Sequence, residues 1–426
     1  GTAAQINTLV GNEGDSGDKV DLDANYTATI SDTDVAASVL NDVNANVPGL
    51  VTATSVTNIT GTAAAINTLM GNEGDSGNKI DLDGNFTVTV DAGSVAAAHL
   101  NTISGKTTGL VTATGATTIT GTAAAINTLV GDEGDSGDKV DLDGNFLVTV
   151  AAGSAAAAHL NTINGKTTNL VTATAVTTIT GTAAAINTLI GNEGDSGDKV
   201  DLDGNFLVTI AAGSHSAAHL NTINAATTGL VTATAATALT GTAAQINTLV
   251  GNEGDSGDKV NLDTDYTATI SDTDVAASVL NTLNSNVPGL ITATSVTNIT
   301  GTAAAINTLM GNEGDSGNKV NLDSDFTVTV DAGSVSAAHL NTINAKTTGL
   351  VTATAVTALT GTAASINTLV GNEGDAGDKV NLDADYTATI SDTDLAASVL
   401  NDLNGNVPGL VDATSITNIT GTAAAI

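Results

Sequence analysis

The sequence lacks cysteine, tryptophan and arginine, and all ten of its basic residues are lysine. A chain without cysteine forms no disulfides, so its stability has to come from burial, repetition or metal ions. The 45 acidic residues give a net charge of −35, and such a surface repels nucleic acid and anionic membranes while it attracts cations. The lack of arginine and of any basic run therefore excludes nucleic acid from the expected partners.

Long apolar runs are missing as well, and aromatic residues make up only 2% of the chain. No run approaches the roughly 20 apolar residues that span a bilayer, so we expect no membrane insertion. No signal peptide is visible, and residue 1 is not Met. Hydrophobic residues still make up 41% of the sequence, which predicts a buried core built from Ala, Val, Leu and Ile.

What the sequence does contain is a 60-residue repeat without insertion or deletion. Seven copies and the start of an eighth occupy 1–60, 61–120, 121–180, 181–240, 241–300, 301–360, 361–420 and 421–426. A fixed period of this kind is typical of arrays whose units pack on their neighbours, so we expect one continuous array over 1–426. Because no polar capping repeat closes either end, we interpret it as a segment of a longer array or a subunit covered by identical neighbours.

Two helices are predicted in the first repeat. Thr2 suits the N-cap of a helix of about nine residues with apolar positions between Ile6 and Val10, and Gly11 suits a left-handed C-terminal position. The Ser-Asp-Thr-Asp segment at 31–34 offers N-cap side chains for a second helix. Alternation of apolar and polar residues predicts short strands in four segments, 20–23, 26–30, 50–54 and 56–60.

Each repeat is itself double, because both halves of about 30 residues follow the order strand–strand–helix. The predicted fold class is therefore an α/β solenoid. It has seven 60-residue repeats, each of two strand–strand–helix turns, with parallel sheets and a row of short helices. Parallel strands joined by crossovers are expected to coil right-handed. Helices need a wider spacing than strands, so we expect the helix side to be convex unless its residues are small.

The repeats occur in two variants. Copies 1, 5 and 7 carry Asp-Thr-Asp before the second helix and a later proline, at Pro48, Pro288 and Pro408. Copies 2, 3, 4 and 6 carry Ala-Gly-Ser and a histidine, at His99, His159, His219 and His339. The apolar period is unchanged, so we expect the variation at the surface and in loops. Together with His215, the histidines are spaced along the array, and we expect surface helix positions rather than a metal cluster.

All seven aromatic residues occupy one position of the repeat, at Tyr26, Phe86, Phe146, Phe206, Tyr266, Phe326 and Tyr386. This position alternates with polar threonine as a core position does. We therefore predict a buried ladder that fixes the register of the stack. The alternative is a row of exposed rings that binds carbohydrate.

A glycine-rich acidic loop follows the first helix of every repeat. Carboxylates at close spacing suit Ca²⁺, which takes six to eight oxygen ligands, and Asn also ligates through its carbonyl where it replaces Asp, as at Asn78. The alternative is a solvated loop in which Lys19 and its counterparts offset part of the charge. The predicted Ca²⁺ ligands, with their counterparts in later repeats, are Glu13, Asp15, Asp18, Asp21, Asp23, Glu73, Asp75, Asp81, Asp83, Glu133, Asp135, Asp138, Asp141 and Asp143.

Thr-x-Thr pairs recur at Thr52 and Thr54 and at their counterparts. Threonine favours strands, and cross-strand Thr–Thr contacts stabilise sheets. A flat ladder of hydroxyls is also the geometry of ice-binding solenoids, which stays open as an alternative. Asp412 interrupts the series and favours the structural interpretation.

Catalysis is not expected. An enzyme needs a nucleophile with a base, an open metal position or a carboxylate in a pocket, and no residue breaks the repetition to provide one.

The segment Leu-Val-Thr-Ala-Thr-Ala-Val-Thr-Thr-Ile-Thr-Gly-Thr-Ala-Ala-Ala-Ile-Asn-Thr-Leu at 170–189, with close variants from 109 and 349, resembles repeats of very large secreted bacterial surface and adhesin-like proteins, as in cyanobacteria and marine bacteria. The resemblance spans the chain. It implies an extracellular or cell-surface location and a role in adhesion, surface coating or filament formation. We predict an extracellular structural protein that forms or belongs to a filament or surface layer, with units stacked head to tail. The alternatives are a calcium-dependent adhesin or glycan-binding array and, third, an ice-binding solenoid.

Overall fold

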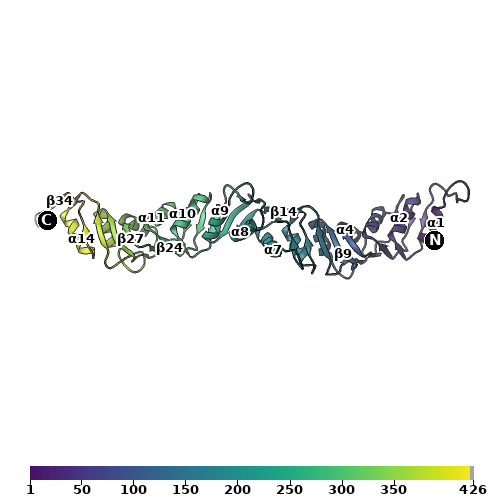
Figure 1. The fold of residues 1–426 in the computed structure, drawn as a ribbon, viewed down its shortest axis with the longest axis horizontal. Coiled ribbons are helices and arrows are strands. Elements are labelled where there is room, and N and C mark those ends of the chain that lie inside the picture. The colour runs from purple at the N-terminus through teal and green to yellow at the C-terminus, as the bar shows by residue number, and fades with distance from the viewer. Residues whose placement is uncertain (423–426) are drawn as a thin grey trace. The chain divides into compact units, whose positions relative to one another are not determined.

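The computed structural model describes residues 1–422 (Figure 1). Each repeat contributes two helices and up to five short strands. Contacts between residues group the chain into two compact units of the same construction. The first unit comprises 1–181, 185–209 and 226–229, and the second comprises 182–184, 210–225 and the residues from 230 on.

Two sets of helices alternate along the chain. The first helices are α1 (Ala3–Val10), α3 (Ala63–Asn72), α5 (Ala123–Gly131), α7 (Ala183–Gly191), α9 (Ala243–Gly251), α11 (Ala303–Asn312) and α13 (Ala363–Gly371). The second helices are α2 (Ala37–Asn46), α4 (Ala97–Ser104), α6 (Ala157–Asn164), α8 (Ala217–Ala226), α10 (Ala277–Asn286), α12 (Ala337–Asn344) and α14 (Ala397–Asn406). Successive helices pack on one another from α1 to α6 in the first unit and from α9 to α14 in the second, which confirms the predicted row. Over residues 1–422, each helix is too short or too polar to cross a membrane.

The strands occupy five positions of the repeat. The position before the aromatic residue gives β5 (Ile80–Asp81), β10 (Val140–Asp141), β15 (Val200–Asp201), β20 (Val260–Leu262), β25 (Val320–Leu322) and β30 (Val380–Leu382). The position after it gives β1 (Ala28–Thr29), β6 (Thr87–Val90), β11 (Leu147–Val150), β16 (Leu207–Ile210), β21 (Thr267–Ile270), β26 (Thr327–Val330) and β31 (Thr387–Ile390). The position before the second helix gives β2 (Asp34–Ala36), β7 (Gly93–Ala96), β12 (Gly153–Ala156), β17 (Gly213–Ser216), β22 (Asp274–Ala276), β27 (Gly333–Ser336) and β32 (Asp394–Ala396). The first position after that helix gives β3 (Val51–Thr52), β8 (Val111–Thr112), β13 (Val171–Thr172), β18 (Val231–Ala233), β23 (Ile291–Ala293), β28 (Val351–Ala353) and β33 (Val411–Asp412). The last position of the repeat gives β4 (Asn58–Gly61), β9 (Ala116–Gly121), β14 (Val176–Gly181), β19 (Ala236–Gly241), β24 (Asn298–Gly301), β29 (Val356–Gly361) and β34 (Asn418–Thr420).

The sheets are parallel, and a complete sheet has five strands. In the first unit the complete sheets are β10-β8-β6-β4-β2 and β15-β13-β11-β9-β7, and in the second they are β17-β19-β21-β23-β25 and β22-β24-β26-β28-β30. Strands β2 and β4 belong to the first repeat, β6 and β8 to the second, and β10 to the third. Each complete sheet therefore joins three successive repeats, which fixes their register through backbone hydrogen bonds. The α/β solenoid of parallel sheets and short helices is confirmed.

The segment 31–34 has a different role from the predicted one. Asp34–Ala36 is strand β2, and α2 begins after Ala36 without a side-chain cap. Asp32 Oδ2 instead accepts a hydrogen bond of 2.6 Å from the backbone N–H of Ala3, at the start of α1. The prediction is wrong because a three-residue strand is too short to show alternation, and because the true partner of Asp32 lies in another turn.

The first helix begins as predicted but ends differently. Thr2 accepts a hydrogen bond of 3.2 Å from the backbone N–H of Gln5, and the Gln5 side chain accepts one from Thr2, so the two form a capping box. Gly11 has a right-handed φ of −68°, and its N–H donates to the Asn7 carbonyl, so the predicted left-handed ending is wrong. The left-handed glycine is Gly17, with φ +77°, in the acidic loop.

Aliphatic and aromatic side chains form the core between the sheets and the helices. Leu40, Ile59 and Ile66 are fully buried, and burial stabilises the fold by about 1.5–3 kcal/mol for each such side chain. The aromatic ladder is buried as predicted, with Phe86 and Tyr266 each 1% exposed. Only the first rung departs from this pattern, because Tyr26 in the outermost turn is half-buried.

Asparagine side chains join successive helices within each unit. Asn41 Nδ2 on α2 donates a hydrogen bond of 2.9 Å to the Ala65 carbonyl on α3. The same bond runs from Asn101 to the Ala125 carbonyl, again at 2.9 Å. A half-buried hydrogen bond of this kind contributes about 0.5–1.5 kcal/mol, and here it is repeated with the period of the sequence.

Candidate functional site

The acidic loop is closed at its base by the backbone. The Val20 N–H donates a hydrogen bond of 3.0 Å to the Asn12 carbonyl, and the Gly14 N–H donates one of 3.1 Å to the Val20 carbonyl. Glu13 thereby forms a parallel bridge with Val20, and the bridge recurs in all seven loops of the described chain. Gly17 and its counterparts have φ between +67° and +77°, a conformation that favours glycine. The loops are therefore defined structures rather than free linkers.

A lysine crosses the loop in the second and sixth repeats, and its hydrogen bond goes to a backbone carbonyl. Lys79 Nζ donates a hydrogen bond of 3.1 Å to the Gly71 carbonyl at the end of α3, where a cation also suits the helix dipole. The side chain passes so close to Gly74 that an added Cβ there would lie 3.4 Å from Lys79 Cγ. The lysine thus positions the loop and offsets part of its negative charge.

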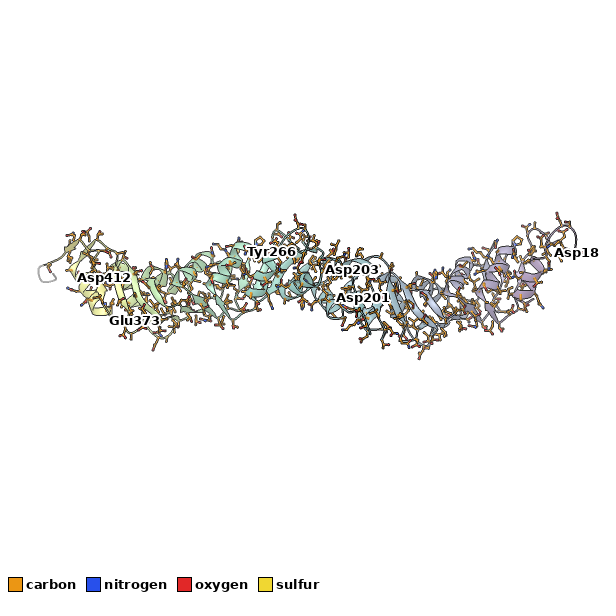
Figure 2. All side chains as sticks on the ribbon, in the orientation of Figure 1. Asp18, Asp201, Asp203, Tyr266, Glu373 and Asp412 are labelled. Carbon is orange, nitrogen blue, oxygen red and sulfur yellow. The ribbon has the colours of Figure 1, made fainter. Side chains whose placement is uncertain are left out.

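The predicted Ca²⁺ ligands occupy four kinds of position in the loop and the strand after it. Figure 2 labels Asp18 in the first loop and Asp201 and Asp203 of the fourth repeat. At the bridge lie Glu13, Glu73 and Glu133. Exposed in the loops lie Asp15, Asp18, Asp75, Asp135 and Asp138. At the strand position lie Asp21, Asp81 and Asp141, and in the exposed turn that follows lie Asp23, Asp83 and Asp143.

The turn aspartates already have a structural role. Asp23 Oδ1 accepts a hydrogen bond of 2.9 Å from the backbone N–H of Asn25, and Asp383 accepts the same bond from Asp385. Within residues 1–422, no three His, Asp or Glu side chains lie together in an arrangement that could hold a metal ion. The structure therefore does not bring the predicted ligands together, and Ca²⁺ binding stays a prediction.

The bridge glutamates lie near the aromatic ladder. Burial, and then the charge of Glu253, raises the pKa of the Tyr266 hydroxyl well above its usual value. Burial, and then Glu373, raises the pKa of Tyr386 to about 12. Burial also raises the pKa of the Glu253 carboxyl. The charge of each of these carboxylates thus acts on the hydroxyl of the ladder tyrosine in its own repeat.

The two repeat variants hold the aromatic residue in different ways. In the proline variant, the Gly289 N–H donates directly to the Tyr266 carbonyl at 3.1 Å. In the histidine variant a buried threonine stands between them: Thr107 Oγ1 donates to the Phe86 carbonyl and accepts a bond of 3.0 Å from the Gly109 N–H. Sequence analysis missed this coupling, although Tyr always occurs with a downstream Val-Pro and Phe with Thr-Thr.

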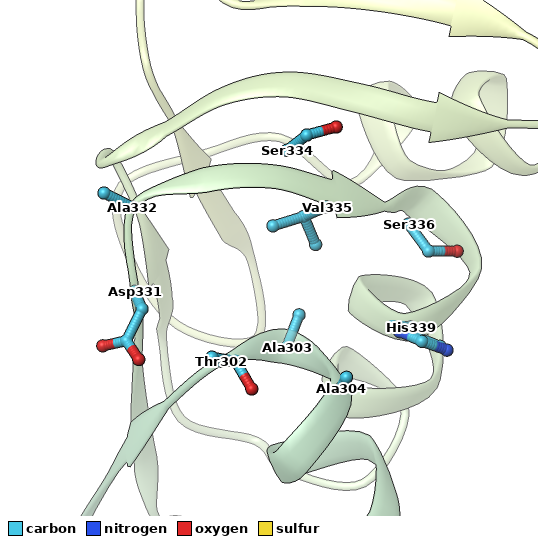
Figure 3. Close-up of a pocket in the computed structure, with 9 residues that line it drawn as sticks. All are labelled: Thr302, Ala303, Ala304, Asp331, Ala332, Ser334, Val335, Ser336 and His339. Atoms are coloured by element: carbon cyan, nitrogen blue, oxygen red, sulfur yellow. The ribbon is translucent and has the colours of Figure 1, made fainter.

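A hollow of about 250 Å³ lies at the start of helix α11 in a histidine-variant repeat (Figure 3). It is lined by Thr302, Ala303, Ala332 and Val335, with Asp331 and His339 at its sides. Ala332 holds the position that Asp272 holds in the proline variant, where the Asp272 carboxylate accepts a hydrogen bond from Ala243. The hollow is therefore the space of the missing carboxylate, while the Thr302 side chain still caps α11.

Threonines lie opposite one another on neighbouring strands as expected, but of each predicted pair only the first, as at Thr112, takes part. Thr60 lies opposite Thr89, and Thr89 lies opposite Thr112. The row ends at Asp141, opposite Thr112. Thr54 lies beyond the end of β3, so the predicted Thr52/Thr54 ladder is not continuous.

The histidines are separate from one another. His99, His159, His219 and His339 lie half-buried on the second helices, so the expected surface position holds only in part. His215 lies on β17 and is 6% exposed, with Nε2 2.7 Å from the Ala211 carbonyl.

Comparison with known proteins does not assign the chain to a family. No family model and no curated protein matches it. Among solved structures, the crystal structure of PEPR1–AtPEP1 matches with 10% sequence identity and a TM-score of 0.16. The match covers 93% of this chain and 64% of that chain, less than two thirds of its length. A likeness this weak carries no argument about fold or function.

Proposed function

We propose that the chain is a structural protein, a stacking unit of an extracellular filament or surface layer. The observation that carries the proposal is the sheet order, in which five strands come from three successive repeats. Each turn therefore has one face that completes the sheets of the turn before it and one that is completed by the turn after it. The best-fitting partner for either face is another turn of the same repeat, supplied here by a second copy of the chain.

Apolar side chains of the first and last described turns show what a neighbouring turn covers. Leu9 is 43% exposed and Val20 is 39% exposed, whereas Leu69, one repeat after Leu9, is fully buried. In the last turn Ile419 is 47% exposed, whereas Ile59 is fully buried. Inside the stack, a neighbouring turn covers the counterparts of these side chains. A further copy of the chain would cover Leu9, Val20 and Ile419 in the same way.

The internal register specifies the joint between copies. Ile59 on β4 lies opposite Val88 on β6, and the same pairing would place Ile419 opposite Ala28 of a following copy. The two-stranded sheet β32-β34 and the three-stranded sheet β1-β3-β5 would then make one sheet of five strands, as in the interior.

The strength of such a joint follows from the same side chains. These three side chains are already more than half buried, so covering them completely contributes about 2–4 kcal/mol, and association costs about 4–15 kcal/mol in lost translation and rotation. Strand hydrogen bonds add to the gain, so we expect assembly that depends on concentration.

In the proposed joint, the first six and the last six residues of the sequence would compete for one place. Residues 1–6 and 421–426 have the same sequence except for Gln5 and Ala425. Gly1 already occupies the place of Gly61, because the Ser31 N–H donates to its carbonyl at 3.0 Å. In the joint, Gly1 of the following copy would lie where the repeat places the residue after Thr420. Residues 1–6 of one copy and 421–426 of the other would therefore need the same place, and only one of these segments fits. We expect deletion of 421–426 to preserve or strengthen assembly.

Electron microscopy and sedimentation velocity of the 426-residue chain, over rising protein concentration, test the proposal. We expect particles that grow in one direction with a layer spacing shared with the single chain. Particles that stay single at all concentrations, both with and without residues 421–426, would overturn it. The extracellular location is supported by the resemblance to secreted surface repeats. Antibody labelling of intact and lysed source cells tests it, and labelling only after lysis would contradict it.

A further inference from the structure

Three of the four histidine-variant repeats contain the same exposed ion pair. Its lysine follows the second helix, and its glutamate is the bridge residue of the acidic loop. The pairs are Lys106–Glu73 at 3.3 Å, Lys166–Glu133 at 3.7 Å and Lys346–Glu313 at 3.2 Å. In these repeats the lysine reaches from the end of the second helix to the glutamate of the acidic loop.

The fourth repeat keeps the glutamate and lacks the lysine. Ala226, at the end of α8, holds the position of Lys106, and Glu193 forms no ion pair within residues 1–422. A hollow of about 240 Å³ lies between Ala226 and Glu193. Its other walls are Ile190, Leu202, Gly204 and Phe206.

We propose that this hollow in the fourth repeat binds a primary alkylammonium group, such as a lysine side chain or a free aliphatic amine. Ile190, Leu202 and Phe206 would line the aliphatic chain, and the Glu193 carboxylate would receive the ammonium group. The ligand would reproduce the contacts that Lys106 makes with Glu73 in the second repeat. The site is thus the lysine-shaped space of a repeat whose other parts are unchanged.

Physical chemistry sets the strength and selectivity of this site. The net charge of −35 raises the concentration of cations near the surface and disfavours anions. An exposed ion pair adds little by itself, so the apolar walls supply most of the affinity through the methylene groups. We expect a dissociation constant on the order of millimolar for a four-carbon chain. An alcohol of the same length should bind about fivefold more weakly, since its hydroxyl can donate a hydrogen bond to the carboxylate but carries no positive charge.

The four phenylalanines of the chain provide four separate probes. The full chain labelled with 4-fluorophenylalanine gives one ¹⁹F signal each for Phe86, Phe146, Phe206 and Phe326. Single Phe→Tyr substitutions assign them, because tyrosine occupies the same ladder position in three repeats. The chain is titrated with n-butylammonium chloride against sodium chloride at equal ionic strength. We expect a saturable shift of the Phe206 signal only. In Glu193→Gln, the dissociation constant obtained from this shift should be about threefold or more higher.

Two variants separate a built site from general cation attraction. Ala226→Leu fills the hollow without changing the charge and should abolish the Phe206 shift. Lys346→Ala opens the equivalent space in the sixth repeat and should make the Phe326 signal respond as well. A shift of all four signals together, no shift at all, or a Phe206 shift that persists in Ala226→Leu would overturn the proposal. A folded Lys346→Ala chain with an unchanged Phe326 signal would also overturn it.

Discussion

Asp32 and Ala3 lie 29 residues apart in sequence, and the Asp32 carboxylate accepts a hydrogen bond of 2.6 Å from the Ala3 backbone N–H. The contact recurs between Asp272 and Ala243 at 2.7 Å. In both places a carboxylate from the following half-repeat caps the first helix and interacts favourably with its dipole. Where the repeat has alanine instead, as at Ala332, the carboxylate contact is missing and a hollow remains, although Thr302 still caps the helix.

Removing or adding this cap should change the local stability of one helix. We expect Asp272→Ala to lower the stability of α9 by about 0.5–2 kcal/mol, and Ala332→Asp to stabilise α11 by a similar amount. Hydrogen exchange followed by mass spectrometry measures both, because a repeat array need not unfold in one step. Asp375→Ala, in an exposed loop, is the control. Unchanged exchange of α9 in Asp272→Ala would contradict the capping role.

The elements that could be predicted from the sequence have local signals. Thr2 and Gln5 are three residues apart and form the capping box, and the aromatic position is visible from its alternation with threonine. The sheet order could not be predicted, because it depends on pairings such as Asn58 with Thr87 between different repeats. Asp32 was misassigned for the same reason, since its partner lies in another turn.

The candidate site also has features that the sequence predicts and features that it does not. The acidic loop and its lysine could be recognised from composition, but the direction of each carboxylate depends on loop geometry, such as the left-handed Gly17 and the backbone bridge at Glu13. The hollow beside Glu193 depends on the single absence of a lysine at Ala226. The missing lysine can be recognised in the sequence only after the structure has shown the Lys–Glu contact of the other repeats.

High pH should destabilise the second unit through its tyrosines. Burial and then Glu373 raise the pKa of Tyr386 to about 12, and burial and then Glu253 raise that of Tyr266. The unfolded chain loses these protons first, near pH 10. The stability that depends on the neutral hydroxyls is therefore fully present below pH 10 and is lost as the pH rises toward 12.

Thermal unfolding between pH 8 and 12 measures this loss. The double variant Tyr266→Phe/Tyr386→Phe should keep more of its stability above pH 10 than the wild-type chain. At pH 8 the Tyr386→Phe substitution should cost no stability, because the Tyr386 hydroxyl is buried without a hydrogen-bond partner in the described structure. Tyr26→Phe is the contrast, because Tyr26 donates a bond of 2.6 Å to the Asn46 carbonyl and should lose stability at pH 8. Identical pH profiles for the double variant and the wild type would contradict the assignment.

Calcium should stiffen the acidic loops if the carboxylates converge on the ion. We expect Ca²⁺ to raise the melting temperature and a chelator to reverse the rise, because binding to the folded state alone stabilises it. Mg²⁺ at equal ionic strength is the control, since it requires a tighter octahedral site. Equal melting temperatures with Ca²⁺ and with chelator would contradict the prediction.

Asp412 should weaken the proposed joint between copies. It is the one aspartate at a position that is threonine in the six earlier repeats, and these threonines lie opposite Asp or Asn of the next repeat, as Thr112 lies opposite Asp141. In the joint, Asp412 would lie opposite Asp21 of the following copy, on strands about 4.8 Å apart. The backbone N–H of Thr414 holds the pKa of Asp412 below its usual value, so the Asp412 carboxylate is charged at neutral pH.

Neutralising either carboxylate should therefore favour assembly. We expect Asp412→Asn and Asp21→Asn each to lower the critical concentration about two- to fivefold at low salt, because like charges on neighbouring strands destabilise their pairing. The double variant should assemble no better than either single one, since removing one charge already removes the repulsion. At about 1 M salt, where the screening length is about 3 Å, the variants and the wild type should converge. Additive effects, or effects that persist at high salt, would show that the two residues do not face each other, whereas a lack of assembly in every variant would contradict the stacking itself.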